Sequence, residues 1–147
     1  MHDNSRKAAT AAAILLAMGL TLSGCSSPRE DVRIALCKDM VQTQLAGAQP
    51  IAWTAVSTEP RGYEHAAVRL RFSAGGKDGE AACYYDYVAR EETAFTVSDP
   101  LAAYATSPSR MVLNGQTLSQ SALAQAVKEA MLKQGRELVD QVKKAFE

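Results

Sequence analysis

The sequence has little of the chemistry that most enzymes and metal proteins use. Its 147 residues include 2 histidines and 3 cysteines, and only one histidine, His65, lies beyond residue 24. A zinc site usually needs several imidazole or thiolate ligands. The chain also lacks the CxxC, GxSxG and GxxxxGK[ST] motifs of thiol oxidoreductases, α/β-hydrolases and P-loop proteins. We therefore expect no catalytic site, no metal and no cofactor.

Two short segments come nearest to known functional motifs. Residues 73–80, SAGGKDGE, are rich in glycine but lead toward a strand, so we expect a turn and not a phosphate loop. Paired carboxylates can hydrolyse glycosides, and this possibility stays open from sequence. The adjacent Glu91 and Glu92 fit a polar connection between strands better than a catalytic pair.

Charge of one sign is also scarce. The chain has 16 basic and 16 acidic residues, and the part that follows residue 24 has a net charge of −1 because Asp3, Arg6 and Lys7 precede it. No long run of one sign occurs. Since nucleic-acid binders usually carry a clustered basic face, we expect no nucleic acid among the partners.

The most apolar run is short and lies near the start of the chain. Ala8 to Leu22 is fifteen residues without a charge, and it follows Arg6 and Lys7. A membrane-spanning helix needs about 20 apolar residues. A basic stretch followed by a shorter apolar run is instead typical of a secretory signal.

The end of this run resembles a known processing site. Leu22-Ser23-Gly24-Cys25 is similar to the lipobox of bacterial lipoprotein precursors at all four positions. The resemblance implies a signal peptide over residues 1–24, cleavage before Cys25 and acylation of Cys25, which would anchor residues 25–147 to a membrane. An ordinary secretory signal or an uncleaved anchor fits the same residues. The resemblance covers residues 1–25 only.

The residue after the cysteine bears on localisation. In lipoprotein families this position influences sorting, and Ser26 fits the class that resides in the outer membrane and faces the periplasm. The periplasmic face of the inner membrane and the cell surface are the alternatives.

Residues 25–147 have the length of a single domain and contain Cys37 and Cys83 besides Cys25. An even pair of cysteines in an exported domain predicts a disulfide, and two unpaired or reactive thiols are the alternative. Helical spacing places Cys37 in an apolar stripe, and strand alternation places Cys83 on the same face as Tyr85. Both patterns predict that the two cysteines point inward.

Hydrophobic spacing predicts an α+β fold with an N-terminal helix, a three- to four-stranded antiparallel sheet and a long C-terminal amphipathic helix. The first helix is expected from a cap at Ser27 to Leu45. Strands are expected within 51–57, 66–74, 80–90 and 93–98. A small hairpin is expected around Asn114-Gly115. The last helix is expected from Ser119 to Phe146, with its apolar residues within one arc: Leu123, Val127, Ala130, Met131, Leu138, Val142 and Ala145.

Two surfaces are candidates for binding. Tyr84 falls on the strand face opposite Cys83, where an aromatic side chain is free to contact a partner, although such residues more often fill or border a sheet. The apolar arc of the last helix fits the core, or in part a docked partner or second copy. The charges of this helix are balanced, whereas membrane-surface helices favour a basic polar face.

The sequence thus predicts an envelope lipoprotein that acts as a non-catalytic interaction or assembly module. Its partners would be the membrane, through Cys25, and another envelope protein, with the oligomeric state left open. The alternative is a periplasmic ligand-binding or enzyme-inhibitor domain. An exposed apolar strip on the last helix favours the first hypothesis. A closed, aromatic-lined pocket between sheet and helix favours the second.

Overall fold

The structure, a computed structural model, describes residues 30–46, 50–88 and 99–146. The helices are α1 (Val32–Gln44) and α3 (Gln120–Ala145). The strands are β1 (Ile51–Arg61), β2 (His65–Ala74), β3 (Lys77–Asp86), β4 (Arg110–Leu113) and β5 (Gln116–Thr117). They form one antiparallel sheet in sequence order. The predicted α+β fold is confirmed, with five strands instead of three or four.

The difference in strand count comes from the hairpin around Asn114-Gly115. Its two arms add to the edge of the sheet as β4 and β5, because Ala81 to Tyr84 of β3 pair with Arg110 to Leu113. Asn114 and Gly115 both have positive φ, as a tight two-residue hairpin turn requires. The strand expected at 93–98 lies outside the described residues.

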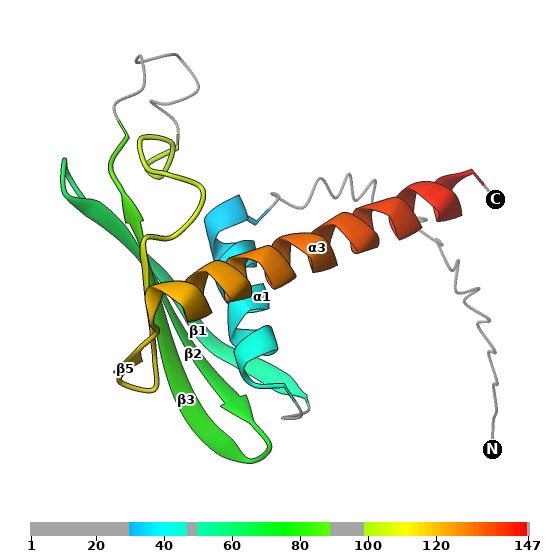
Figure 1. Cartoon of the computed structure of the whole chain (residues 1–147), viewed down its shortest axis with the longest axis horizontal. Helices are drawn as coiled ribbons and strands as arrows, with labels where there is room; N and C mark the ends of the chain where they lie inside the picture. The colour runs from blue at the N-terminus through cyan, green and yellow to red at the C-terminus, as the bar shows by residue number, and fades with distance from the viewer. Residues whose placement is uncertain (1–29, 47–49, 89–98, 147) are drawn as a thin grey trace, which may run out of the picture.

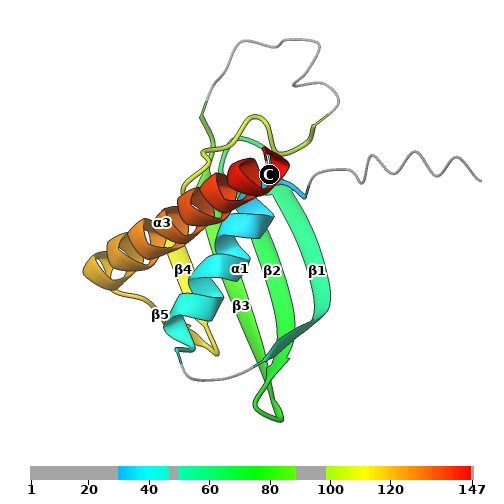
Figure 2. The same ribbon diagram turned by 90° about the vertical axis from the view of Figure 1, so that its right-hand side faces the viewer.

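Both helices lie on the same face of the sheet (Figure 1). Seen from that side, α1 and α3 lie in front of the strands (Figure 2). The two helices contact each other through Lys133 and Gln134 of α3 and Asp39 in the second half of α1. No described helix or strand covers the other face. The fold is therefore two layers, with a core between the helices and the inner face of the sheet.

The first helix begins later than the sequence suggests. Its N-cap is Asp31, whose carboxylate accepts a hydrogen bond from the backbone N–H of Arg33 at 2.8 Å. Glu30, expected inside the helix, precedes it, and Ser27 lies outside the described residues. Aspartate is among the best N-cap residues, since its carboxylate satisfies an otherwise unpaired backbone donor.

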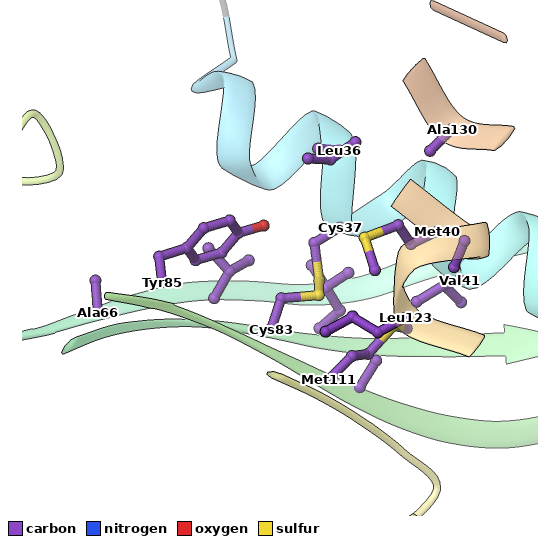
Figure 3. Close-up of a cluster of buried hydrophobic side chains, with 14 of the residues drawn as sticks. Leu36, Cys37, Met40, Val41, Ala66, Cys83, Tyr85, Met111, Leu123 and Ala130 are labelled. Carbon is purple, nitrogen blue, oxygen red and sulfur yellow. A yellow bond between two sulfur atoms is a disulfide. The ribbon is translucent and has the colours of Figure 1, made fainter. Parts of the chain in front are cut away.

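The core is built around the predicted disulfide. Cys37 of α1 and Cys83 of β3 are bonded, with their Cα atoms 6.1 Å apart and both side chains fully buried. Figure 3 shows this bond among side chains of α1, β2, β3, β4 and α3. The predicted pairing is confirmed. The large buried side chains around it are Met40, Val41, Val68, Leu70, Tyr85, Met111 and Leu123.

The β2–β3 connection is a tight turn, as predicted for the glycine-rich segment. Gly75 and Gly76 both have positive φ, of 57° and 75°. A few residues further on, Gly79 lies opposite Phe72 in the sheet, and a Cβ there would come within 2.5 Å of the Phe72 ring. Phe72 therefore covers the backbone of β3, and its ring packs edge-on against Trp53 at 5.8 Å.

The last helix forms as predicted but packs differently. Ser119 is its N-cap and Phe146 its C-cap. Only Leu123, Ala126 and Ala130 are buried in the core. The apolar arc packs on the core only in part, because Met131, Leu138 and Val142 are about half exposed. The alternative that part of the arc docks a partner or second copy stays a prediction. From Gly135 to Ala145 every residue of α3 is exposed, and this part of the helix projects beyond the sheet and α1 (Figure 1).

Candidate functional site

Tyr84 lies on the open face of the sheet, opposite the disulfide, as its position in β3 predicts. It pairs across the sheet with Ala67 of β2 and Arg110 of β4. The guanidinium carbon of Arg110 lies 3.9 Å from the centre of the Tyr84 ring, a cation–π distance. His65 packs edge-on against the same ring at 5.5 Å. The Tyr84 ring thus lies between Arg110 and His65, and its side chain is half-buried.

Small residues hollow the open face beside Tyr84. Ala67 and Ala82 are only 1% and 7% exposed, because longer side chains surround them. Above Ala82 is a shallow cavity of about 190 Å³, lined also by Tyr84, Arg69 and Val112. We call this feature the Ala82 hollow. Residues of β2, β3 and β4 form this hollow. The sequence did not predict it, because the residues that surround an alanine in a sheet are known only once the strand register is known.

The charges around the Ala82 hollow are mostly basic. Arg69 donates its Nε–H to Glu59 at 2.9 Å, and this hydrogen bond and charge raise the pKa of Arg69. Arg71 and Glu80 line the hollow and pair across β2 and β3, but their side chains do not form an ion pair. Among the described residues, Arg71 and Arg110 have no carboxylate partner. Their guanidinium groups are therefore available to an acidic partner.

A second, wider depression adjoins the hollow. Its volume is about 640 Å³, and it shares Arg71 and Glu80 with the Ala82 hollow. Gly79 and Asn114 form part of its floor and wall, and Thr54 reaches it from the point where the register of β1 shifts. Neither depression lies between the sheet and the helices, which is where the ligand-binding hypothesis expected a closed pocket.

The other predicted site residues have simpler surroundings. Cys25 lies outside the described residues. Cys37 and Cys83 are sealed in the core and offer no surface to a partner. His65 contacts Tyr84, and within the described ranges no cluster of three or more histidine, cysteine, aspartate or glutamate side chains is arranged to bind a metal.

The large apolar side chains exposed on α3 are the second feature, with two of them just before the projecting part and the rest within it or at its end. They are between 49% and 89% exposed, and we call them the α3 stripe: Met131, Leu132, Leu138, Val139, Val142 and, at the C-cap, Phe146. At about 100° per residue the centre of this stripe lies roughly 150° around the helix from the buried Leu123, Ala126 and Ala130. The α3 stripe is therefore a separate face and not an extension of the core-facing one.

A buried arginine, which sequence analysis missed, ties α1 to the segment before β4. Arg33 is 4% exposed, and its guanidinium donates to the carbonyls of Tyr104 at 2.7 Å and Ala105 at 3.0 Å and pairs with Asp31 at 3.1 Å. All its charge is engaged by protein groups, so we assign it a structural role. The sequence around Arg33 does not indicate that its side chain binds the carbonyl groups of Tyr104 and Ala105.

A second buried polar group closes this arrangement. The hydroxyl of Tyr85 donates to the carbonyl of Arg33 at 2.8 Å. Burial raises the pKa of Tyr85 well above its usual value of 10. The charge of Arg33 lowers it and the charge of Asp31 raises it, both by less. Tyr85 therefore acts as a neutral hydrogen-bond donor inside the core, and not as an acid or base.

Among the described residues, no helix is both long enough and apolar enough to cross a bilayer. Comparisons of the chain with protein-family models, with curated proteins and with solved structures found no match.

Proposed function

We propose that this chain is a lipid-anchored protein of the bacterial cell envelope that binds an acidic envelope protein through the open face of its sheet and catalyses no reaction. The lipobox resemblance at Leu22 to Cys25 supports the anchor. The buried disulfide between Cys37 and Cys83 supports an oxidising compartment, where such bonds persist. Ser26 favours the outer membrane, with the protein facing the periplasm.

The observation that carries the binding role is the uncovered Tyr84–Arg110 pair beside the Ala82 hollow. Tyrosine and arginine are enriched where proteins bind each other, because both combine apolar contact area with hydrogen bonding. Arg71 and Arg110 carry charges that no described carboxylate neutralises. An acidic side chain of a partner would complete these pairs, and this complementarity favours an acidic partner surface.

In-cell photocrosslinking tests the binding role. A photoreactive amino acid replaces Ser57, which is exposed and pairs with Arg69 on the same face, and a control probe replaces Gln44 at the exposed end of α1. We expect a discrete crosslinked species from Ser57 only, and we expect Arg110→Ser to abolish it. Arg110 is exposed, so its loss leaves the fold intact. A Ser57 product that survives Arg110→Ser, or no product at all, overturns the proposed binding surface.

The anchor has its own test. Cells that express the chain are labelled with radioactive palmitate, and the wild-type protein should incorporate label and fractionate with membranes. Cys25→Ala should take up none. Equal labelling of both proteins contradicts the lipoprotein assignment.

The alternative function is capture of a small ligand, and the Ala82 hollow is the observation that favours it. At about 190 Å³ the hollow lies below the ~300 Å³ of the smallest usual ligand pockets, and it suits one acidic side chain of a partner better than a whole ligand molecule. The adjoining depression of about 640 Å³ reaches the usual size, so a small ligand would bind there.

A further inference from the structure

The α3 stripe exposes six large apolar side chains, and all but Met131 and Leu132 lie where α3 projects beyond the body of the protein. Such a surface is a liability in free solution, since contiguous exposed apolar patches promote association. It spans residues 131–146, or about 24 Å at 1.5 Å per residue. It faces roughly 150° away from the core, and no described helix or strand covers it.

The position of the anchor limits what that occupant is. Five residues separate Cys25 from the N-cap of α1 at Asp31, so the two lie within about 20 Å of each other even when the chain is fully extended. The start of α1 and the C-terminal end of α3 both lie in the upper part of the molecule, although α3 ends well away from α1 (Figure 1). A bilayer that runs along this upper side would reach both the anchor and the projecting part of α3.

Every charged residue of α3 that lies beside the stripe is basic. Lys128, Arg136 and Lys143 lie within about 100° of the stripe's centre, at 100° per residue. The far side of the helix, at about 120° or more from the centre, carries charges of both signs: Glu129, Lys133, Glu137, Asp140 and Lys144. Interfacial helices have this arrangement, with basic residues beside the apolar face where they reach anionic headgroups.

We propose that the projecting part of α3 lies on the surface of the membrane that holds Cys25, with the α3 stripe inserted among the acyl chains of an anionic bilayer. The inference rests on the proposed lipid anchor. The helix is a second attachment, which fixes the orientation of the protein. In that orientation α3 occupies the membrane surface, and the open face with Tyr84 stays free for a partner.

Fluorescence quenching by brominated lipids tests the inference on the lipidated protein. The protein is reconstituted into phosphatidylethanolamine–phosphatidylglycerol vesicles with brominated acyl chains, with tryptophan placed at Val142 in the stripe or at Asp140 on the far side. Both positions are exposed, so neither change disturbs packing. We expect Val142→Trp to be quenched about twofold more than Asp140→Trp, because interfacial helices bury their apolar face ~5–10 Å deep. The wild-type protein, which contains Trp53 alone, gives the baseline.

Equal quenching at the two positions overturns the inference. So does a blue-shifted but unquenched Val142→Trp signal that depends on protein concentration, since a second copy would then cover the stripe. Failure of the anchor gives a different result, because a protein without palmitate label would not be incorporated into the vesicles through Cys25. Labelled protein with equal quenching refutes the membrane-bound helix alone.

Discussion

From Gln120 to Gln134, α3 contains all of its buried residues, whereas from Gly135 to Ala145 every residue is exposed. The first part presents small residues to the core, and Ala126 and Ala130 are fully buried because they let the helices approach closely. The second part carries larger apolar residues that are about half exposed. The comparison shows that hydrophobicity alone does not decide which part of an amphipathic helix is buried, because the length and angle of the helix also matter.

A polar contact marks the boundary between these two parts. Asp39 of α1 accepts hydrogen bonds from Lys133 at 2.5 Å and from Gln134 at 2.8 Å. Beyond these residues, no hydrogen bond or ion pair between described residues joins α3 to α1. The packed part should therefore respond to core mutations and the projecting part should not, and the following predictions test this difference.

The largest effect is expected from removing the disulfide. The bond closes a loop with a sequence separation of 46, and in the loop-entropy model it stabilises the fold by roughly 4 kcal/mol. Cys37→Ala with Cys83→Ala should lower the free energy of unfolding by about this amount in urea titrations monitored by circular dichroism. A loss below about 1 kcal/mol would show that the bond contributes little to the core.

A matched pair of leucines compares the two parts of α3 directly. Leu123 is 4% exposed and Leu138 is 61% exposed. Leu123→Ala should cost about 2–4 kcal/mol of unfolding free energy, because it leaves a cavity in the core. Leu138→Ala should change it by no more than about 0.5 kcal/mol. Similar costs for the two changes would mean that the projecting part is packed in solution.

Alkaline pH should destabilise the core through Tyr85. Its pKa is raised in the folded state, so this contribution to stability is complete below about pH 10, the ordinary tyrosine pKa, and is lost as the pH rises above it. The loss should approach about 1.4 kcal/mol per pH unit above that point. Tyr85→Phe should flatten the dependence in urea titrations between pH 9 and 12. Tyr63→Phe is the control, because Tyr63 is 85% exposed, and an unchanged slope in Tyr85→Phe contradicts the assignment.

The smallest effect is a gain in stability within the projecting part. A Cβ at Gly135 would meet no atom within 4 Å. Gly135→Ala should raise helix stability by about 0.5–1 kcal/mol, since glycine costs helices conformational entropy. The thermal midpoint should rise slightly if α3 unfolds together with the core. A fall in the midpoint would indicate a close contact at Gly135 in solution.

Much of the core was predictable because its residues repeat with regular periods. The alternation around Cys83 and the helical spacing around Cys37 predicted one covalent contact between two elements, and the structure confirms it. The same alternation placed Tyr84 on the opposite face. The alternation of apolar and polar residues within one helix or strand shows which side chains lie on the same face. These predictions therefore required no knowledge of the tertiary structure.

The rest depends on contacts that no local period encodes. The Ala82 hollow exists because the register of β2, β3 and β4 places the short Ala82 between Arg69 and Val112. Arg33 finds its carbonyl partners more than 70 positions away. The exposure of Leu138 follows from where α3 ends relative to the sheet, which its own sequence does not specify.

The contacts of Arg33 also determine how the protein resists a mechanical pull. A load that enters the domain from the N-terminal side first reaches Asp31 and the first turn of α1. There the Arg33 guanidinium donates hydrogen bonds to the carbonyls of Tyr104 and Ala105, before β4. The Arg33 carbonyl accepts a hydrogen bond from the hydroxyl of Tyr85 in β3. One turn further on, the Cys37–Cys83 bond joins the helix covalently to the same strand. The force is therefore divided between the segment before β4 and the sheet before α1 can unfold. This arrangement suits a domain that is tethered at its N-terminal end.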